Sequence, residues 1–150
     1  MPSLTFDTPV GQLTLTETEG AITRVSWDGE AGDETDLLAD AKAQLTAYFA
    51  GDLQKFDLPL TVHGSDLQRR VCAEMLKIPF GETRTYGDLA LSLGAPAQAI
   101  GQACGGNPIP VIIPCHRILG ANSLGGFSGM AGVETKVWLL KHERAGGLLI

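Results

Sequence analysis

The spacing of hydrophobic residues in the first 50 positions predicts a small sheet followed by a helix. Residues 12–17 alternate between apolar and polar side chains, as in a strand that is buried on one face. Shorter apolar runs at 4–6 and 22–27 predict two more strands, and the short turns between the three favour antiparallel pairing. Apolar residues then recur at helical spacing over 36–49, which predicts a helix with one buried face.

An extended linker at 52–63 separates this lobe from a second, mostly helical part. Ser65 and Gln68 form a capping box, and the apolar residues that follow lie at helical spacing. Pro79 and Gly81 are expected to end this helix, because proline and glycine both interrupt the helical backbone.

Two short helices follow in close succession. Thr85 and Asp88 make a second capping pattern that opens a helix over 86–93, and Gly94 ends it. The next helix runs from residue 97 to about 104. Two short helices joined by a glycine-containing turn predict a helix-turn-helix, although many such pairs never touch DNA.

The remaining sequence alternates between loops and regular structure. A glycine- and proline-rich loop at 105–110 leads into a buried extended run at 111–113. A glycine-rich loop at 120–132 precedes a closing helix at 133–144.

These elements predict an α/β N-terminal lobe, made of a three-stranded antiparallel sheet plus a helix, and a mostly α-helical C-terminal domain with a helix-turn-helix. We place the first domain and the linker at 1–62 and the second domain at 63–150. With 150 residues and 44% hydrophobic side chains, the chain can build a core without disulfide bonds.

Composition also restricts the location. No run of about 18 apolar residues is present, so we expect no membrane span. The first residues lack the basic start and long apolar stretch of a signal peptide, which favours the cytoplasm.

The net charge of −6 argues at first against a nucleic-acid partner, but the charge is unevenly distributed. Residues 1–62 carry 11 acidic and 3 basic side chains, whereas residues 63–150 carry 6 acidic and 8 basic ones. The second part is therefore mildly basic. If it binds DNA, its attraction to phosphate should be modest and sensitive to salt.

The three cysteines, Cys72, Cys104 and Cys115, form no CxxC pair and no zinc-like pattern with the histidines, so we expect no metal. Cys115 is the candidate nucleophile, because it lies between a proline and a histidine in a segment too irregular to serve packing alone. His116 is the candidate base, acting through a water, and Glu143 is a candidate acceptor for the second ring nitrogen. A buried structural role for Cys115 is the alternative.

The segment Ile-Pro-Cys-His-Arg-Ile at 113–118 resembles the active-site signature of the O6-alkylguanine-DNA alkyltransferases. Other segments resemble the same family in the same order along the chain. They are Phe-Gly-Glu-Thr at 80–83 with Tyr-Gly at 86–87, Gly-Gly-Asn-Pro at 105–108, Gly-Phe-Ser-Gly at 126–129, and the closing helix at 136–143.

The resemblance implies a suicide reaction in which Cys115 accepts the alkyl group by in-line displacement. It also implies that His116 deprotonates Cys115 through a water, that Glu143 orients His116, that Asn107 braces the loop, and that Tyr86 assists the departing guanine. Because a thioether is not readily hydrolysed, each molecule should act once and need no cofactor.

The resemblance further implies a substrate pocket. Ser128 would bind near O6, Pro110 and Phe127 would wall the pocket, and backbone groups of Cys115 and Ile118 would read the guanine edge. Phe127 stands where the family often has tyrosine. The implied substrate is O6-alkylguanine, with O4-alkylthymine as an additional candidate.

The implied partner is double-stranded DNA, bound through its minor groove by a monomeric protein. Ala97, Ala99 and Gly101 are small enough for close approach of the recognition helix, and the target base would be flipped out of the stack. The family fills the vacated space with an arginine, whereas this chain has Gln98. That substitution is expected to affect the repair of duplex DNA and not the thiol chemistry.

Several other residues have two interpretations. Arg84 and Arg117 are candidate DNA contacts, although a structural ion pair is an equal alternative for Arg117. Cys72 and Cys104 are expected in the core, and His63 and His142 in solvent. A weak phosphate-binding face, with a solvated surface as the default, could comprise Arg69, Arg70, Arg84, Lys136 and Lys141.

Two other functions remain possible at this stage. A non-catalytic sensor of alkylguanine would fit Gln98, but related sensors have another residue at the position of Cys115. A cysteine hydrolase is disfavoured, because the sequence shows no oxyanion arrangement.

Overall fold

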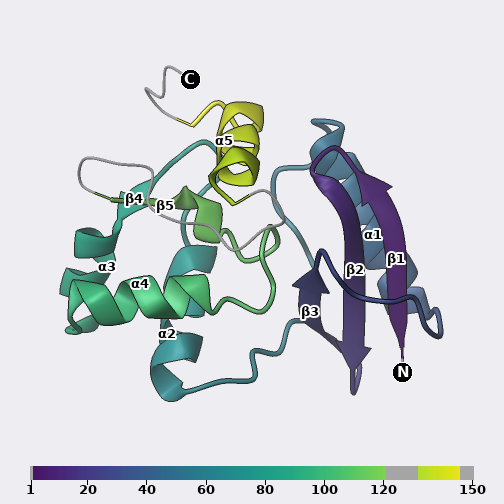
Figure 1. The fold of residues 1–150 in the computed structure, drawn as a ribbon, viewed down its shortest axis with the longest axis horizontal. Coiled ribbons are helices and arrows are strands. Elements are labelled where there is room, and N and C mark those ends of the chain that lie inside the picture. Colours follow the sequence, from purple (N-terminus) through teal and green to yellow (C-terminus); the bar gives the residue numbers. More distant parts are fainter. Residues whose placement is uncertain (1, 121–131, 146–150) are drawn as a thin grey trace.

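The structure, a computed structural model, describes residues 2–120 and 132–145. The chain begins with the predicted antiparallel sheet of β1 (Ser3–Thr8), β2 (Gly11–Thr18) and β3 (Ala21–Ser26), in that order (Figure 1). The helix α1 (Asp36–Phe49) follows, with the predicted bounds. The fold of the first lobe is therefore confirmed.

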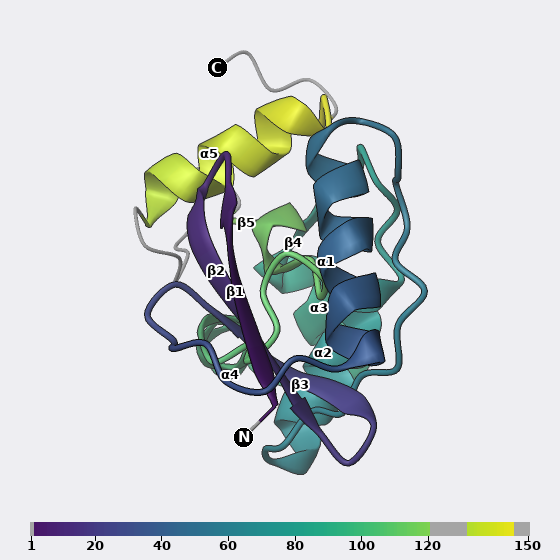
Figure 2. The ribbon, with the colours of Figure 1, turned by 90° about the vertical axis from the view of Figure 1, so that its right-hand side faces the viewer.

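Apolar side chains of the strands and of α1 meet in the layer between the sheet and the helix, and polar side chains of the strands such as Thr14 and Thr23 are buried as well. The helix packs against β1 and β2 (Figure 2). The buried side chains of this layer are Leu4, Phe6, Leu13, Leu15, Ile22 and Val25 from the sheet, and Leu38, Ala41, Leu45 and Tyr48 from the helix.

The second part contains α2 (Asp66–Leu76), α3 (Tyr86–Leu93) and α4 (Ala97–Gly105). Thr85 caps α3 in a capping box with Asp88, as its sequence predicts. Gly94 ends α3 with a φ of 64°, a left-handed conformation that glycine adopts without strain. The α3–α4 pair has the order and the tight turn of a helix-turn-helix.

The closing elements are a 3₁₀ turn η1 (Cys115–Arg117), the short strand β5 (Ile118–Leu119) and the helix α5 (Val133–His142). The sequence analysis extended this last helix to Arg144. In the structure Glu143 is its C-cap, and Arg144 has a φ of 52°, which a helix cannot continue through.

One element of the structure, a two-stranded parallel ladder, was not predicted from the sequence. The strand β4 (Arg84–Thr85) pairs with β5, so that Arg84 lies opposite Ile118 and Thr85 opposite Leu119. This ladder joins the start of the helix-turn-helix to the segment that follows Cys115.

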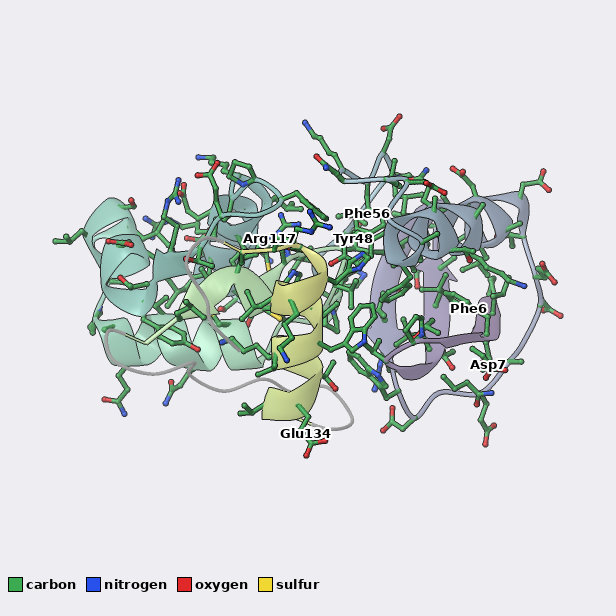
Figure 3. All side chains as sticks on the ribbon, turned by 90° about the horizontal axis from the view of Figure 1, so that it is seen from above. Phe6, Asp7, Tyr48, Phe56, Arg117 and Glu134 are labelled. Atoms are coloured by element: carbon green, nitrogen blue, oxygen red, sulfur yellow. The ribbon has the colours of Figure 1, made fainter. Side chains whose placement is uncertain are left out.

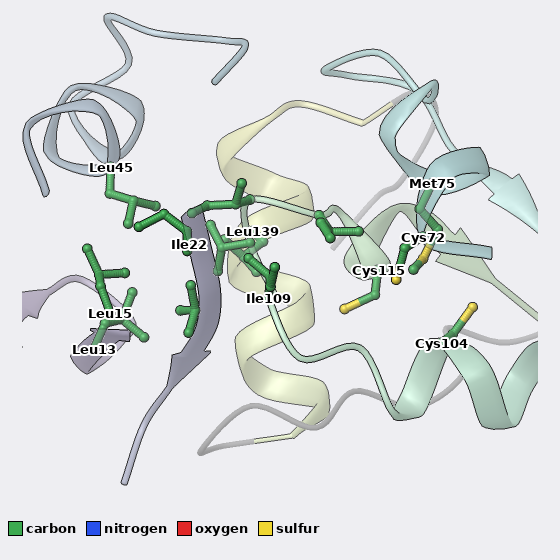
Figure 4. Packing of buried hydrophobic residues seen from close by; sticks show 14 of the residues in the cluster. Leu13, Leu15, Ile22, Leu45, Cys72, Met75, Cys104, Ile109, Cys115 and Leu139 are labelled. Carbon is green, nitrogen blue, oxygen red and sulfur yellow. The ribbon is translucent and has the colours of Figure 1, made fainter. Parts of the chain in front are cut away.

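The two parts of the chain share one hydrophobic cluster, which runs from the sheet through Ile109 and Leu139 to Met75 and the cysteines (Figure 4). The linker contributes to this contact, because the backbone of Ile22 pairs with that of the segment 59–61. The helix α5 lies between the sheet and the helix-turn-helix (Figure 1). Among the described residues, no helix is long and apolar enough to cross a membrane.

Candidate active site

Cys115 is presented by a short loop with a constrained backbone. The amide of Ile113 donates to the carbonyl of Ile109 (2.9 Å), and the amide of Cys115 donates to the carbonyl of Ile113 (2.8 Å). Within this turn Val111 has a φ of 72°, an unusual value for a β-branched residue. Such backbone strain costs about 1–3 kcal/mol and persists only where the surroundings enforce it.

Asn107 is the residue that closes this loop. Its buried side-chain amide donates to the carbonyl of Ile113 (2.9 Å), and its side-chain oxygen accepts from the amide of Ile109 (3.0 Å). The bracing contacts expected of Asn107 are therefore present in the structure. Without Asn107 the buried amide of Ile109 would lose its acceptor, and the carbonyl of Ile113 would lose one of its donors.

Cys115 is buried, with only 6% of the residue exposed. Burial raises its pKa to about 11, against the effects of a hydrogen bond from Asn107 and the positive charge of Lys136, which both lower it. At neutral pH the resting group is a thiol, and a base must remove its proton before sulfur can act as a nucleophile.

His116 is fully buried directly after Cys115 and is held by Glu143. Its Nε2 lies 2.7 Å from Oε2 of Glu143. Its Nδ1 is buried, with no hydrogen-bond partner among the described residues. Because a carboxylate can only accept, Nε2 carries the proton in this pair, which leaves Nδ1 as the nitrogen that can receive another.

Glu143 is in turn surrounded by donors. Arg117 donates from Nε to Oε1 (2.8 Å) and from Nη2 to Oε2 (3.0 Å). Burial alone would raise the pKa of Glu143, but the hydrogen bonds from His116 and Arg117 hold it at about 2. The carboxylate is therefore charged throughout the neutral range.

Arg117 forms a structural ion pair, which is one of the two alternatives that the sequence left open. Only 7% exposed, it pairs with Glu143 and donates from Nη1 to the carbonyl of Ile78 (2.6 Å). Its guanidinium also lies 5.9 Å from the ring centre of Phe80. Because the side chain is buried, it is not part of a surface that could contact DNA, contrary to the first of the two alternatives.

Lys136 does not belong to a surface phosphate-binding face. Its side chain is fully buried, and Nζ donates to the carbonyl of Ile118 (2.5 Å). Burial lowers its pKa to about 8, opposed by the nearby Cys115 and Cys104. The sequence analysis did not predict the burial of Lys136. It stands three and four positions before the buried Leu139 and Leu140, and so shares their helix face.

His142 is also more enclosed than predicted. Its ring stacks on Trp138 with centroids 5.0 Å apart, and its Nε2 donates to the backbone carbonyl of Tyr48 (2.6 Å). The expectation of a solvent-facing His142 is wrong, because α5 packs beside α1. His63 is exposed, and Cys72 and Cys104 are buried, as predicted.

The remaining predicted site residues are only partly tied to this centre. Tyr86 is half-buried at the start of α3, one position after the ladder with β5. Pro110 and Ile118 are buried on either side of Cys115. Phe127 and Ser128, expected to line the substrate pocket, lie outside the described residues.

The predicted recognition helix presents a neutral surface. Ala97 and Gln98 are exposed, Ala99 is half-buried, and a side chain added at Gly101 would meet nothing within 4 Å. Nearby, Arg84 is exposed and lies 3.5 Å from Glu82, which offsets part of its charge. Among the described residues, no cluster of three or more side chains could hold a metal ion.

The structure combines a helix-turn-helix with a buried thiol and a histidine–carboxylate pair, and a short ladder links the two. This is the arrangement of a DNA-binding protein with cysteine chemistry. Comparison with known sequences agrees. A sequence model described as 6-O-methylguanine DNA methyltransferase, DNA binding domain, matches residues 66–145, and one described as the ribonuclease-like domain of that protein matches residues 3–62. The chain therefore belongs to the 6-O-methylguanine DNA methyltransferase family.

Individual relatives are similar over nearly the whole chain. The methylated-DNA–protein-cysteine methyltransferase of Mycobacterium tuberculosis is 41% identical and covers 94% of this chain and 91% of its own length. The constitutive enzyme of the same name from Bacillus subtilis is 41% identical, with 93% of each chain covered. The crystal structure of Mycobacterium tuberculosis OGT in complex with DNA has a TM-score of 0.86 at 40% identity, covering 96% of this chain and 93% of its own.

Proposed function

We propose that this protein repairs DNA by transferring the alkyl group of O6-alkylguanine irreversibly to Cys115. Methyl transfer from DNA to a protein cysteine is the reaction for which its relatives are named. The choice of cysteine rests on one observation. His116 directly follows Cys115, is buried and bonds to Glu143, and its Nδ1 remains available to accept a proton. Neither Cys72 nor Cys104 is followed by a histidine.

The first step is removal of the thiol proton. Glu143 holds the proton on Nε2 of His116, so that Nδ1 accepts the proton of Cys115 through a bridging water. The positive charge of Lys136 favours the thiolate that results. The imidazolium is stabilised by the charged carboxylate beside it.

The second step is displacement at the alkyl carbon. A bond forms between the sulfur of Cys115 and that carbon, while the bond from the carbon to O6 of guanine breaks and its electron pair stays on the base. Tyr86 assists by donating a proton to the departing guanine. The products are an unmodified guanine and a thioether, and the reaction consumes the protein.

Access to the base requires its extrusion from the duplex. We place α4 in the minor groove, where the small residues Ala97, Ala99 and Gly101 permit close approach. Gln98 would occupy the vacated position and hydrogen-bond the orphaned partner base without adding charge. Arg84 would contact phosphate at the edge of this surface.

The substrate side completes the proposal. Pro110 and Phe127 wall the alkyl pocket, Ser128 binds near O6, and the backbone of Ile118 reads the guanine edge. The protein acts as a monomer in the cytoplasm and needs no cofactor. O4-alkylthymine is an additional candidate substrate.

The test is incubation with O6-benzylguanine, and separately with a duplex containing O6-methylguanine, followed by intact mass measurement and peptide mapping. We expect one stable adduct on Cys115, retained in Cys72→Ala and Cys104→Ala and lost in Cys115→Ala. Tight binding to the methylated duplex without a mass change would favour a damage sensor. Repeated turnover of an ester would favour a hydrolase.

A further inference from the structure

Tyr48 belongs to the N-terminal lobe, yet its hydroxyl reaches the histidine–carboxylate pair. The side chain is fully buried in the last turn of α1, and its hydroxyl donates to Oε2 of Glu143 at 2.5 Å. The two residues are 95 positions apart in the sequence. Figure 3 shows Tyr48 beside Arg117 where the two parts of the chain meet.

The acceptor of this hydrogen bond is the same oxygen that holds His116. Oε2 of Glu143 receives Tyr48 at 2.5 Å, His116 at 2.7 Å and Arg117 at 3.0 Å, whereas Oε1 receives only Nε of Arg117 from among the residues that the structure describes. Two of the three donors on Oε2 come from η1 and the third from the other lobe. Tyr48 therefore competes with His116 for the negative charge of one oxygen.

The ring of Tyr48 is fixed, which makes the hydroxyl a directed donor. Phe49, Phe80 and His142 meet the ring edge to face, with centroids between 5.0 and 6.1 Å away, and Phe56 packs on it at 5.4 Å. The backbone carbonyl of Tyr48 is held by Nε2 of His142.

We propose that Tyr48 is a positioning residue for alkyl transfer, which fixes the carboxylate of Glu143 and limits how tightly that carboxylate holds a proton on His116. The inference rests on the proposed function, because it assigns Tyr48 a part in the same proton transfer. It also makes the N-terminal lobe a component of the reaction centre, since α1 supplies one of its hydrogen bonds.

The charges around His116 determine the expected effect. Glu143 and Lys136 face it from α5, and Cys115 and Arg117 adjoin it in η1. Burial lowers the pKa of His116, Glu143 raises it, and Arg117 and Lys136 lower it. Removal of the Tyr48 hydroxyl leaves more negative charge on Oε2, so the pKa of His116 should rise. A histidine that is already protonated cannot accept the proton of Cys115.

The test variant is Tyr48→Phe, which keeps the ring and removes only the hydroxyl. The rate of labelling by free O6-benzylguanine is measured between pH 5 and 9, so that DNA binding plays no part. We expect the acidic limb of the profile to move up by about one pH unit, a roughly tenfold loss of rate on that limb, because hydrogen bonds to charged groups have effects of this size. At the alkaline plateau the rate should stay within about threefold of wild type.

Thr23→Val is the matched control, because it removes a buried hydroxyl of β3 whose hydrogen bonds within residues 2–120 and 132–145 go to Thr16 and Thr18 of the same sheet. Its profile should coincide with that of wild type. The second readout is the titration of the His116 ring by ¹⁵N NMR, which should move upward in Tyr48→Phe and stay unchanged in Thr23→Val.

Two results would overturn the inference. One is a Tyr48→Phe protein whose rate profile and His116 titration both superimpose on those of wild type. The other is a loss of rate that is equal at every pH, which would make Tyr48 a packing residue only. Failure of the wild-type protein to become labelled would instead reject the proposed function, and the NMR titration would still decide the role of Tyr48.

Discussion

Replacement of Glu143 by glutamine should make the stability of this protein depend less on pH. The carboxylate has a pKa of about 2 in the folded protein, against an ordinary value of 4.5. A lowered folded-state pKa contributes stability that is fully present above the unfolded-state value and is lost as the pH falls toward the folded-state value. The relevant window for Glu143 is therefore pH 4.5 down to 2.

The size of the effect follows from the same shift. Each pKa unit corresponds to about 1.4 kcal/mol, so the depressed pKa of Glu143 represents about 3 kcal/mol of stability at neutral pH. At pH 3 only about 1.4 kcal/mol should remain, because the carboxyl group is then mostly protonated in the unfolded chain. What is left reflects only the interval between pH 3 and the folded-state pKa of about 2. Glu143 is 2% exposed, so screening by solvent reduces these values little.

The assay is urea unfolding of wild type and Glu143→Gln at pH 7, 5 and 3, followed by tryptophan fluorescence. Glu134→Gln is the control, because Glu134 is an exposed carboxylate on the same helix; it should stay within about 0.5 kcal/mol of wild type. A difference between wild type and Glu143→Gln that is as large at pH 3 as at pH 7 would refute the reasoning. Equal stability at pH 7 would refute it as well.

Three further predictions concern single residues. Gln98→Arg should raise the rate on methylated duplex and scarcely change the rate on free O6-benzylguanine; equal effects on both substrates would argue against a base-extrusion role. Asn107→Ala should lower the stability by about 2 kcal/mol in urea unfolding, because the buried amide of Ile109 loses its acceptor and the carbonyl of Ile113 loses one of its donors, and a variant of wild-type stability would contradict the bracing role. Lys136→Met should slow labelling of Cys115 at pH 7 about tenfold, with recovery at higher pH, because a cation near the sulfur is lost. A pH-independent rate ratio would show that this charge does not act on the thiol.

Local signals explain why most elements could be predicted from the sequence. The alternation at 12–17 predicts a strand, and the capping residues Thr35, Ser65 and Thr85 each bond to the backbone three positions on, so the starts of α1, α2 and α3 are encoded within one turn. The ladder of β4 and β5 could not be found in this way. Each strand has two residues, and the partners are more than 30 positions apart.

The candidate site could be predicted where its residues are adjacent in the sequence, and could not where they meet through tertiary packing. The Cys115–His116 pair is visible in the sequence itself. Tyr48 gives no comparable signal, because an apolar position in an amphipathic helix reads as core and its acceptor lies 95 positions away. Lys136 and Arg117 mislead for a related reason, since long basic side chains suggest surface unless their buried acceptors are known.

The strained turn at Val111 has a consequence for the order of events on DNA. A β-branched residue with a φ of 72° is held there by the hydrogen bonds of Asn107 and its neighbours, so folding, rather than substrate, supplies the free energy that shapes this turn. The sulfur is thus preorganised before any damaged base arrives. In the proposed reaction, interaction energy gained from the duplex can then be used to extrude the nucleotide, because none of it is needed to assemble the attacking group.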